Sequence, residues 1–312
     1  MGKVVLVTGA NGFVGRHLVS RLCGDSSCEV VATDTHENLV AFGNVDRERI
    51  TYVNGKLDDD AFTESLCATY RFDTIVHLAG LLSKSSDPAG RGLLFDVNVR
   101  GTQRILECSV SGGARFIFPS TGLVYGNQTG PFTEDMDRCP RDFYALSKLL
   151  GEELIRCSSE TFGFEHVVFR PGVLYGPGQR GVMFIPSLVH ALATASELEM
   201  TGGAQTRDLV YVEDFVDALH AAIAAECLRG VFNIGTGAPV ALRDIARLGE
   251  ELAGVEGIVK PGRVPYREHE IWEYCLDSRR ARETLGWEPK TALREGLRRA
   301  IEYETTSRQV GT

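Results

Sequence analysis

The chain has 312 residues, a formal net charge of −9 and eight cysteines. This length is enough for one large α/β domain and a smaller second lobe. The acidic balance and the scattered positive residues exclude the basic stripe of a nucleic-acid-binding surface. No apolar run approaches the roughly 20 residues of a membrane span, and no signal peptide precedes the first strand pattern. We expect a cytoplasmic protein that binds neither nucleic acid nor a membrane.

The cysteines form no CxxC pair and have no histidine-rich neighbour. Metal sites need close ligand pairs, and most of these cysteines fall inside apolar stretches. The pattern favours reduced, buried thiols over a zinc site or a disulfide framework, so no metal is expected.

Short apolar runs alternate with helical patterns through the first two thirds of the chain. Continuous runs of this kind are typical of strands in a parallel sheet that is covered on both faces. The predicted strands are 3–8, 28–33, 50–53, 73–79, 115–120 and 165–170, and the predicted helices between them are 14–22, 60–67, 97–110 and 143–160. Strict alternation of strand and helix predicts an α/β fold with a doubly wound parallel sheet.

After residue 170 the pattern loosens into turns rich in glycine and proline. Helices are predicted at 184–193, 213–225, 242–253, 278–285 and 293–304. We expect residues 1–170 to form the cofactor domain, with later returns near 208–234. Residues 171–312 are then mainly a smaller C-terminal lobe that binds substrate.

The first predicted strand ends in TGANGFVG, which places Gly9, Gly12 and Gly15 before an apolar helix. Glycine allows a tight turn and a close approach of the backbone to a pyrophosphate, which then lies on the free N–H groups of the helix. The second strand is followed by Asp34, whose carboxylate can accept hydrogen bonds from an adenosine ribose. A carboxylate there also repels a 2′-phosphate, which favours NAD over NADP.

Two further stretches carry groups that can move a proton. STGLVYG begins with the adjacent hydroxyls of Ser120 and Thr121, and YALSK places Tyr144 and Lys148 one helical turn apart. A nearby ammonium favours the phenolate, so Tyr144 could exchange a proton with a substrate hydroxyl. Taken alone, tyrosine and lysine at this spacing are also common on solvated helices.

These motifs occur in order with HLAG, RPGVLYGPGQ, QTRDLVYVEDFVDA, FNIGTG and LGWEPK. Together they resemble the extended short-chain dehydrogenase/reductases, and among them the NAD-dependent nucleotide-sugar epimerase/dehydratase family of UDP-glucose 4-epimerase type. The likeness covers essentially the whole chain. It implies a Rossmann-type fold, NAD as cofactor and a catalytic set of Thr121, Tyr144 and Lys148.

The resemblance also implies binding residues. Those for the cofactor are Gly9, Asn11, Gly12, Phe13, Val14, Gly15, Asp34, Leu57, Leu78, Ala79, Gly80, Asn98, Tyr144, Lys148, Pro171 and Val173. Those for a nucleotide-diphosphate sugar are Ser120, Thr121, Arg180, Arg207, Arg267 and Glu270. Two arginines can bracket a diphosphate by charge-assisted bonds. His77, in an apolar strand, is expected to be a satisfied core histidine and not a catalytic one.

Family dehydratases place an Asp-Glu pair directly after the catalytic threonine, whereas this chain has Gly122 and Leu123. Elimination of water is therefore disfavoured, and hydride transfer with proton exchange at one hydroxyl remains. We favour NAD-dependent 4-epimerisation of a UDP-hexose or UDP-hexuronate, and we expect the enzyme to be a homodimer. The alternatives are a 4-ketosugar reductase or dehydrogenase and a non-catalytic NAD-binding regulator.

Overall fold

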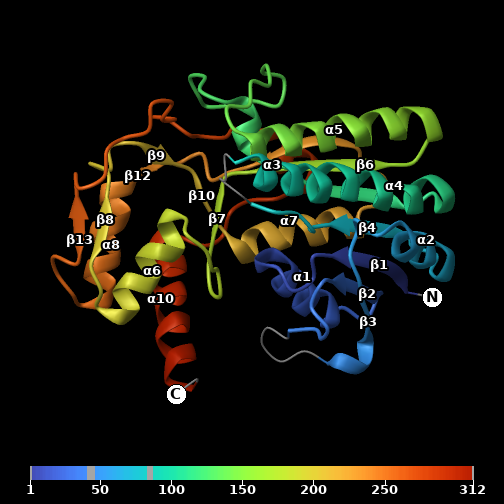
Figure 1. Cartoon of the computed structure of the whole chain (residues 1–312), viewed down its shortest axis with the longest axis horizontal. Helices are drawn as coiled ribbons and strands as arrows, with labels where there is room; N and C mark the ends of the chain where they lie inside the picture. The colour runs from blue at the N-terminus through green and yellow to red at the C-terminus, as the bar shows by residue number, and fades with distance from the viewer. Residues whose placement is uncertain (1, 41–45, 83–86, 311–312) are drawn as a thin grey trace. The chain divides into compact units, whose positions relative to one another are not determined.

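The computed structural model describes residues 2–40, 46–82 and 87–310, and the chain divides into two compact units (Figure 1). The first unit comprises residues 1–126, 137–170 and 216–232. The second comprises residues 127–136, 171–215 and 233–312. Each unit has a hydrophobic core of its own.

A seven-stranded sheet forms the centre of the first unit, in the order β11-β6-β5-β4-β1-β2-β3. The neighbouring strands from β6 to β3 all pair in parallel. The strands are β1 (Lys3–Thr8), β2 (Cys28–Asp34), β3 (Ile50–Asn54), β4 (Thr74–His77), β5 (Arg115–Pro119), β6 (His166–Pro171) and β11 (Gly230–Ile234). The doubly wound α/β fold expected from the alternating pattern is thereby confirmed.

The sheet is buried because its strands are apolar on both faces and helices cover them. Leu6, Ile75 and Phe116 are fully buried, and they belong to a cluster that α2, α4 and α5 close over one face. The helices of this part of the chain are α1 (Phe13–Cys23), α2 (Asp60–Thr69), α3 (Pro88–Phe95), α4 (Gly101–Gly112), α5 (Phe143–Phe162) and α7 (Val212–Ala224). A π-helical turn, η2 (Asp96–Arg100), joins α3 to α4, and short 3₁₀ turns lie at η1 (Arg47–Arg49) and η3 (Gly122–Tyr125).

Helix boundaries follow from local capping chemistry. The side chains of Asp59, Asp87 and Asp142 accept hydrogen bonds from the first-turn N–H groups of α2, α3 and α5 respectively. Helix α5 ends at Gly163, whose φ of +82° is the left-handed conformation that glycine adopts without strain. The long helix that carries Tyr144 and Lys148 is therefore fixed at both ends.

In its described residues, up to position 310, the second unit contains three two-stranded sheets and four helices. The pairs are β7 (Val173–Tyr175) with β10 (Leu209–Tyr211), β9 (Thr206–Arg207) with β12 (Val240–Ala241), and β8 (Leu198–Met200) with β13 (Val259–Pro261). The helices are α6 (Phe184–Thr194), α8 (Leu242–Ala253), α9 (Arg279–Leu285) and α10 (Leu293–Val310). The apolar sides of α6, α8 and α10 form its core.

One expectation about the cysteines is wrong. Cys67 of α2 and Cys108 of α4 form a disulfide, with their Cα atoms 4.9 Å apart. The two residues are 41 positions apart, so the pattern gave no sign of the pairing, which arises because α2 packs beside α4. The other six cysteines are free thiols, but Cys139, Cys157 and Cys227 are exposed, so the expectation of burial is wrong for these three as well.

The part of the chain that the structure describes contains neither a membrane-spanning helix nor a group of metal-ligating side chains. None of its helices is long and apolar enough to cross a membrane. No three side chains among its His, Cys, Asp and Glu residues are grouped so that they could hold a metal ion.

Candidate active site

The three glycines after β1 each meet a different steric demand. Gly9 has a φ of +66°, and a Cβ there would lie 2.6 Å from the backbone nitrogen of Ala79. A Cβ on Gly15 would lie 2.1 Å from the Gly9 carbonyl oxygen, so only glycine lets α1 pack this closely on the turn. A Cβ on Gly12 would meet only that carbonyl, at 3.0 Å, and Gly12 is exposed.

The start of α1 is suited to a phosphate. Gly12 is its N-cap residue, and no side chain caps the helix. The first N–H groups of an α-helix lack partners within the helix, and the helix dipole attracts negative charge to them. Gly12 N itself donates to Gly9 O at 2.9 Å, so Phe13, Val14 and Gly15 supply the backbone donors of this turn, which fits a dinucleotide pyrophosphate.

Asp34 ends β2 beside this turn. Its Oδ2 atom accepts a hydrogen bond of 2.9 Å from the backbone nitrogen of Asn11, which ties the carboxylate to the glycine loop. The Asn11 side chain holds the next segment, since its Oδ1 accepts from Val40 N at 2.7 Å and its Nδ2 donates to Asn38 O at 3.1 Å. This arrangement leaves Asp34 next to the pyrophosphate cradle, where an adenosine ribose would bind.

A chain of hydrogen bonds runs through the buried His77 at the end of β4. Ala79 N donates to Thr8 Oγ1 at 3.1 Å, Thr8 Oγ1 lies 2.8 Å from His77 Nδ1, and His77 Nε2 lies 3.0 Å from Thr102 Oγ1. Thr102 donates its hydrogen to Asn98 O at 2.6 Å, so it must accept from the imidazole. The proton of His77 is therefore on Nε2, and Thr8 donates to Nδ1. Burial lowers the pKa of His77 to about 3, with the Lys148 charge adding to the effect.

Asn98, in the π-helical turn η2, links the β4 loop to α5. Its side chain accepts from Leu81 N at 2.7 Å and donates to Leu81 O and to Ser147 Oγ, at 3.0 and 2.9 Å. Ser147 in turn donates to the carbonyl of Tyr144 at 2.8 Å. A Cβ on Gly80 would lie 3.3 Å from Asn98 Oδ1 and 3.8 Å from Lys148 Nζ, so these groups gather at the ends of β4 and α5.

Leu57, Leu78 and Ala79 are the remaining predicted cofactor residues of the first unit. All three are partly buried, and Leu57 packs against the apolar cluster under α2 and α4. Leu78 N donates to Thr8 O at 3.2 Å, which extends the pairing of β4 with β1 by one residue.

Burial shifts the pKa values of Tyr144 and Lys148 on α5 in opposite directions. It raises the pKa of Tyr144 to about 12, and Asp142 adds to the rise. It lowers the pKa of Lys148 to about 8, against the opposing charge of Glu152. The Lys148 ammonium also lies 4.4 Å from the centre of the Phe118 ring. The expectation that this ammonium lowers the pKa of Tyr144 is not met, because burial dominates.

Thr121 follows β5 and begins the turn η3. It is 8% exposed, and its Oγ1 accepts from the backbone nitrogen of Leu123 at 3.2 Å. Ser120 Oγ points instead to Glu152, at 2.5 Å. The two adjacent hydroxyls are thus directed to different partners.

The second unit carries the other predicted residues. Val173 begins β7, and the carbonyl of Pro171 accepts from Tyr274 Oη at 3.3 Å. Arg207 forms an ion pair of 2.5 Å with Glu270, which is 7% exposed, and Arg207 also donates to Ile271 O. Arg180 and Arg267 are exposed.

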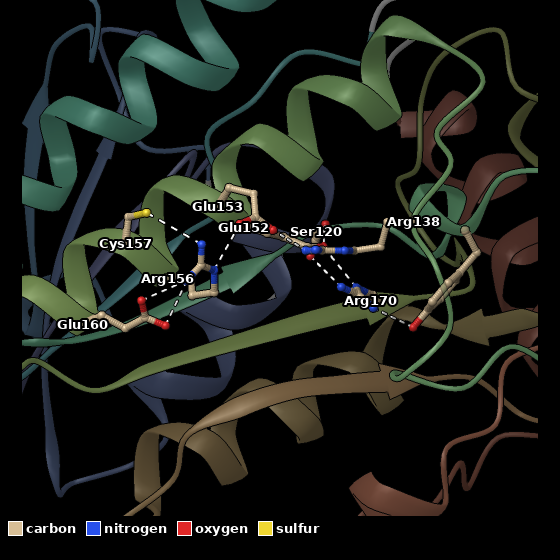
Figure 2. Close-up of polar contacts among 9 residues, drawn as sticks. Ser120, Arg138, Glu152, Glu153, Arg156, Cys157, Glu160 and Arg170 are labelled. Carbon is tan, nitrogen blue, oxygen red and sulfur yellow. Dashed lines mark hydrogen bonds and ion pairs between the residues drawn. The ribbon is translucent and has the colours of Figure 1, made fainter.

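The sequence analysis overlooked a buried ion pair in the first unit (Figure 2). Glu152 lies one turn after Lys148 on α5, and its carboxylate pairs with Arg170 at the end of β6 at 2.7 Å. The only feature of the sequence that pointed to Glu152 is its position four residues after Lys148. Such spacing usually marks a surface pair, and the sequence alone does not show that this part of α5 is buried.

The fold is that of a Rossmann-type α/β protein, with a glycine turn between β1 and α1, Asp34 at the end of β2, Thr121 after β5, and Tyr144 and Lys148 on α5. A family model described as NAD dependent epimerase/dehydratase family matches residues 5–235. The chain belongs to this family, and it is an NAD-dependent enzyme. The family and cofactor expected from the motifs are confirmed.

Individual relatives align over nearly the whole chain. A UDP-glucose 4-epimerase of Mycolicibacterium smegmatis is 34% identical, with 96% of this chain and 97% of the relative covered. The structure of a UDP-glucose 4-epimerase from Thermotoga maritima with UDP-glucose has a TM-score of 0.89 at 29% identity, covering 99% and 100%. That of a UDP-glucuronic acid 4-epimerase from Bacillus cereus with UDP-glucuronic acid and NAD has a TM-score of 0.88 at 26% identity, covering 97% and 99%.

Proposed function

We propose that this enzyme is a UDP-sugar 4-epimerase that acts on a UDP-hexose or a UDP-hexuronate. The main support is the position of three residues. Thr121 follows the carboxyl end of β5, and Tyr144 and Lys148 lie on α5, in the same unit as the glycine turn that fits NAD. The similar proteins named above act on UDP-glucose and UDP-glucuronic acid, which supports this substrate class.

Each residue of the set has a distinct task. Tyr144 takes the proton of the sugar 4-hydroxyl, and Thr121 holds that oxygen by a hydrogen bond. Lys148 supplies positive charge one helical turn away, which favours the phenolate once the site is filled. Bound NAD supplies the acceptor and later the donor of the hydride at carbon 4. If the 4-ketosugar turns over while bound, the hydride returns to its other face and the configuration is inverted.

The turn η3 disfavours the dehydratase reaction of the same family. Elimination needs an acid and a base next to the catalytic threonine, but η3 continues from Thr121 with Gly122 and Leu123. Gly122 is buried and Leu123 contributes only its backbone N–H to Thr121. Neither residue can remove a carbon-bound proton or expel a hydroxyl.

Isotope labelling tests the proposal directly. Purified protein with catalytic NAD should interconvert UDP-glucose and UDP-galactose, or the corresponding uronates, over many turnovers. Substrate deuterated at carbon 4 should keep its label in unlabelled water, because the hydride returns to the carbon that it left.

A ketosugar reductase would behave differently. It would consume one reduced cofactor per product, seen as stoichiometric loss of absorbance at 340 nm, and would not interconvert epimers without added reduced cofactor. A protein that binds NAD but turns over no sugar would be a regulator.

We also propose that the enzyme is a cytoplasmic homodimer that associates through α5 and the neighbouring α3. Leu93, Phe143 and Leu150 on these two helices are 54%, 43% and 38% exposed, so three large apolar side chains are available for a contact between subunits. Light scattering should give twice the chain mass for the wild type and the monomer mass for Leu150→Glu. A monomeric wild type would contradict the proposal.

A further inference from the structure

One buried ion pair lies beside the turn that carries Thr121 (Figure 2). Glu152 and Arg170 are 4% and 2% exposed. Arg170 Nε lies 3.1 Å from Glu152 Oε1, and Arg170 Nη2 lies 2.7 Å from Glu152 Oε2. Two parallel charge-assisted hydrogen bonds fix the orientation of both side chains.

Each member of the pair contacts one end of the turn. Glu152 Oε1 lies 2.5 Å from Ser120 Oγ, and Ser120 directly precedes Thr121. Arg170 Nη1 lies 2.8 Å from the hydroxyl of Tyr125, the last residue of η3, and the guanidinium lies 5.0 Å from the centre of its ring. Residues 120–125 are therefore anchored at both ends to α5 and β6.

Each hydroxyl has one hydrogen to donate, and this gives the adjacent hydroxyls of Ser120 and Thr121 different roles. A carboxylate paired with a guanidinium is ionised and can only accept, so Ser120 donates its single hydrogen to Glu152. That hydrogen cannot be given to a sugar oxygen at the same time. Thr121 Oγ1 accepts from Leu123 N, which leaves the hydrogen of Thr121 for a substrate.

The same helix connects this anchor to the groups that move the proton. Tyr144, Lys148 and Glu152 are spaced by four residues on α5 and so share one face of the helix. The Glu152 charge also acts on Lys148, where it opposes the lowering of the pKa by burial. Contacts with Glu152 thus fix the turn of residues 120–125 relative to α5, the helix that carries Tyr144.

We propose that Glu152, oriented by Arg170, is a positioning residue that fixes the Thr121 hydroxyl relative to Tyr144 by holding Ser120 and Tyr125. This inference rests on the proposed function, because it takes Thr121 and Tyr144 as the groups that contact the sugar. It also reassigns Ser120 from a substrate contact to an internal anchor.

Ser120→Ala is the most informative variant, because it removes one hydrogen bond and keeps the ion pair. We expect kcat for UDP-sugar epimerisation to fall about 10- to 100-fold, since small displacements of catalytic groups are costly. KM should stay within about twofold, because no substrate contact is lost. An unchanged kcat would overturn the proposal.

A double-variant cycle separates positioning from direct contact. In a Thr121→Ala background, adding Ser120→Ala should change kcat by less than about twofold, because the hydroxyl that Ser120 positions is already gone. If the two losses multiply instead, Ser120 acts on the substrate independently, and the proposal is wrong.

Glu152→Gln has a matched control in its neighbour. Glu153 pairs with Arg138 and Arg156 at the surface (Figure 2). We expect Glu152→Gln to lose at least as much kcat as Ser120→Ala, and Glu153→Gln to keep the wild-type value. An equal loss of kcat in both variants would indicate a general weakening of α5 and would contradict a specific role for Glu152. If Glu152→Gln does not fold, the cycle with Ser120→Ala still decides.

Amide hydrogen exchange tests the anchor without reference to activity. The amides of Leu123, Val124 and Gly126 are hydrogen-bonded within the turn, and they should exchange faster in Ser120→Ala than in the wild type or Glu153→Gln. A wild type that interconverts no UDP-sugar would contradict the proposed function, and the exchange rates would still show whether the anchor exists. Unchanged exchange rates in Ser120→Ala would overturn the proposal that Ser120 anchors the turn.

Discussion

At the residue scale, burial favours the neutral forms of Tyr144 and Lys148, the two ionisable groups of the proposed catalytic set. It raises the pKa of Tyr144 to about 12 and lowers that of Lys148 to about 8. If Tyr144 is the base, as proposed, its phenol needs an additional nearby positive charge to lose its proton near neutral pH. Sequence reasoning placed these two residues together by their spacing but could not weigh burial against charge.

Replacing Tyr144 with phenylalanine removes the proton carrier. Because only one hydroxyl is lost from a partly buried ring, the fold should be retained. Epimerisation should slow by about 100-fold or more, as expected when a general base is removed. Wild-type turnover together with an unchanged circular dichroism spectrum would mean that another group is the base.

His77 is expected to make stability depend on pH in acid. Its pKa is lowered to about 3 by burial, so the unfolded chain binds the proton first as the pH falls below about 6.5. The free energy of unfolding should then decrease by about 1.4 kcal/mol per pH unit between about pH 6 and pH 4 from this residue alone.

Urea unfolding at several pH values measures this dependence. His77→Gln should be less stable at neutral pH, because the Thr8–His77–Thr102 chain is broken, but its stability should fall less steeply in acid. His269→Gln, at an exposed position, should keep the wild-type slope. Equal slopes in all three proteins would contradict the assignment of a neutral, buried His77.

At the element scale, the glycine loop before α1 has a sharp steric test. A Cβ on Gly15 would lie 2.1 Å from the Gly9 carbonyl oxygen, a fixed backbone atom, so Gly15→Ala must displace α1 from the loop. Calorimetric titration should show loss of NAD binding. Gly112→Ala at the end of α4 meets nothing within 4 Å, and should bind NAD normally with equal or higher stability.

Elements whose signals are local could be predicted, and elements that depend on tertiary packing could not. The first strand was predicted at its observed bounds because a run of apolar residues ends at a glycine turn. Helix α3 was overlooked, although Asp87 and Pro88 form a recognisable start. Strand β11 was not predicted as a strand, although residues near 208–234 were expected to return to the cofactor domain.

At the scale of the whole molecule, the predicted ligand contacts are divided between two units. The first carries the glycine loop, Thr121, Tyr144 and Lys148, and the second carries Arg207, Arg267 and Glu270. This division could be anticipated in outline from the change of pattern after residue 170. Residues 216–232 belong to the first unit and lie within the range near 208–234 for which a return to the cofactor domain was expected.

Arg207→Ala tests whether the second unit recognises the nucleotide diphosphate. The guanidinium can donate charge-assisted hydrogen bonds to phosphate oxygens, each contributing about 1.5–3 kcal/mol. We therefore expect the Kd of UDP to rise by roughly 10- to 100-fold, while NAD affinity stays within about twofold, in calorimetric titrations with each ligand.

Two companion variants make the result interpretable. Arg207 holds Glu270, which is almost fully buried, so Arg207→Ala leaves a carboxylate without its partner and lowers stability as well. Arg207→Lys keeps a positive charge beside Glu270 but loses the two-pronged geometry, so its UDP affinity should lie between those of wild type and Arg207→Ala. Arg294→Ala, which removes an exposed pair with Glu251 in the same unit, should leave both affinities unchanged. If Arg207→Ala weakens NAD binding and spares UDP, the diphosphate must be bound elsewhere, and the assignment of Arg207 is wrong.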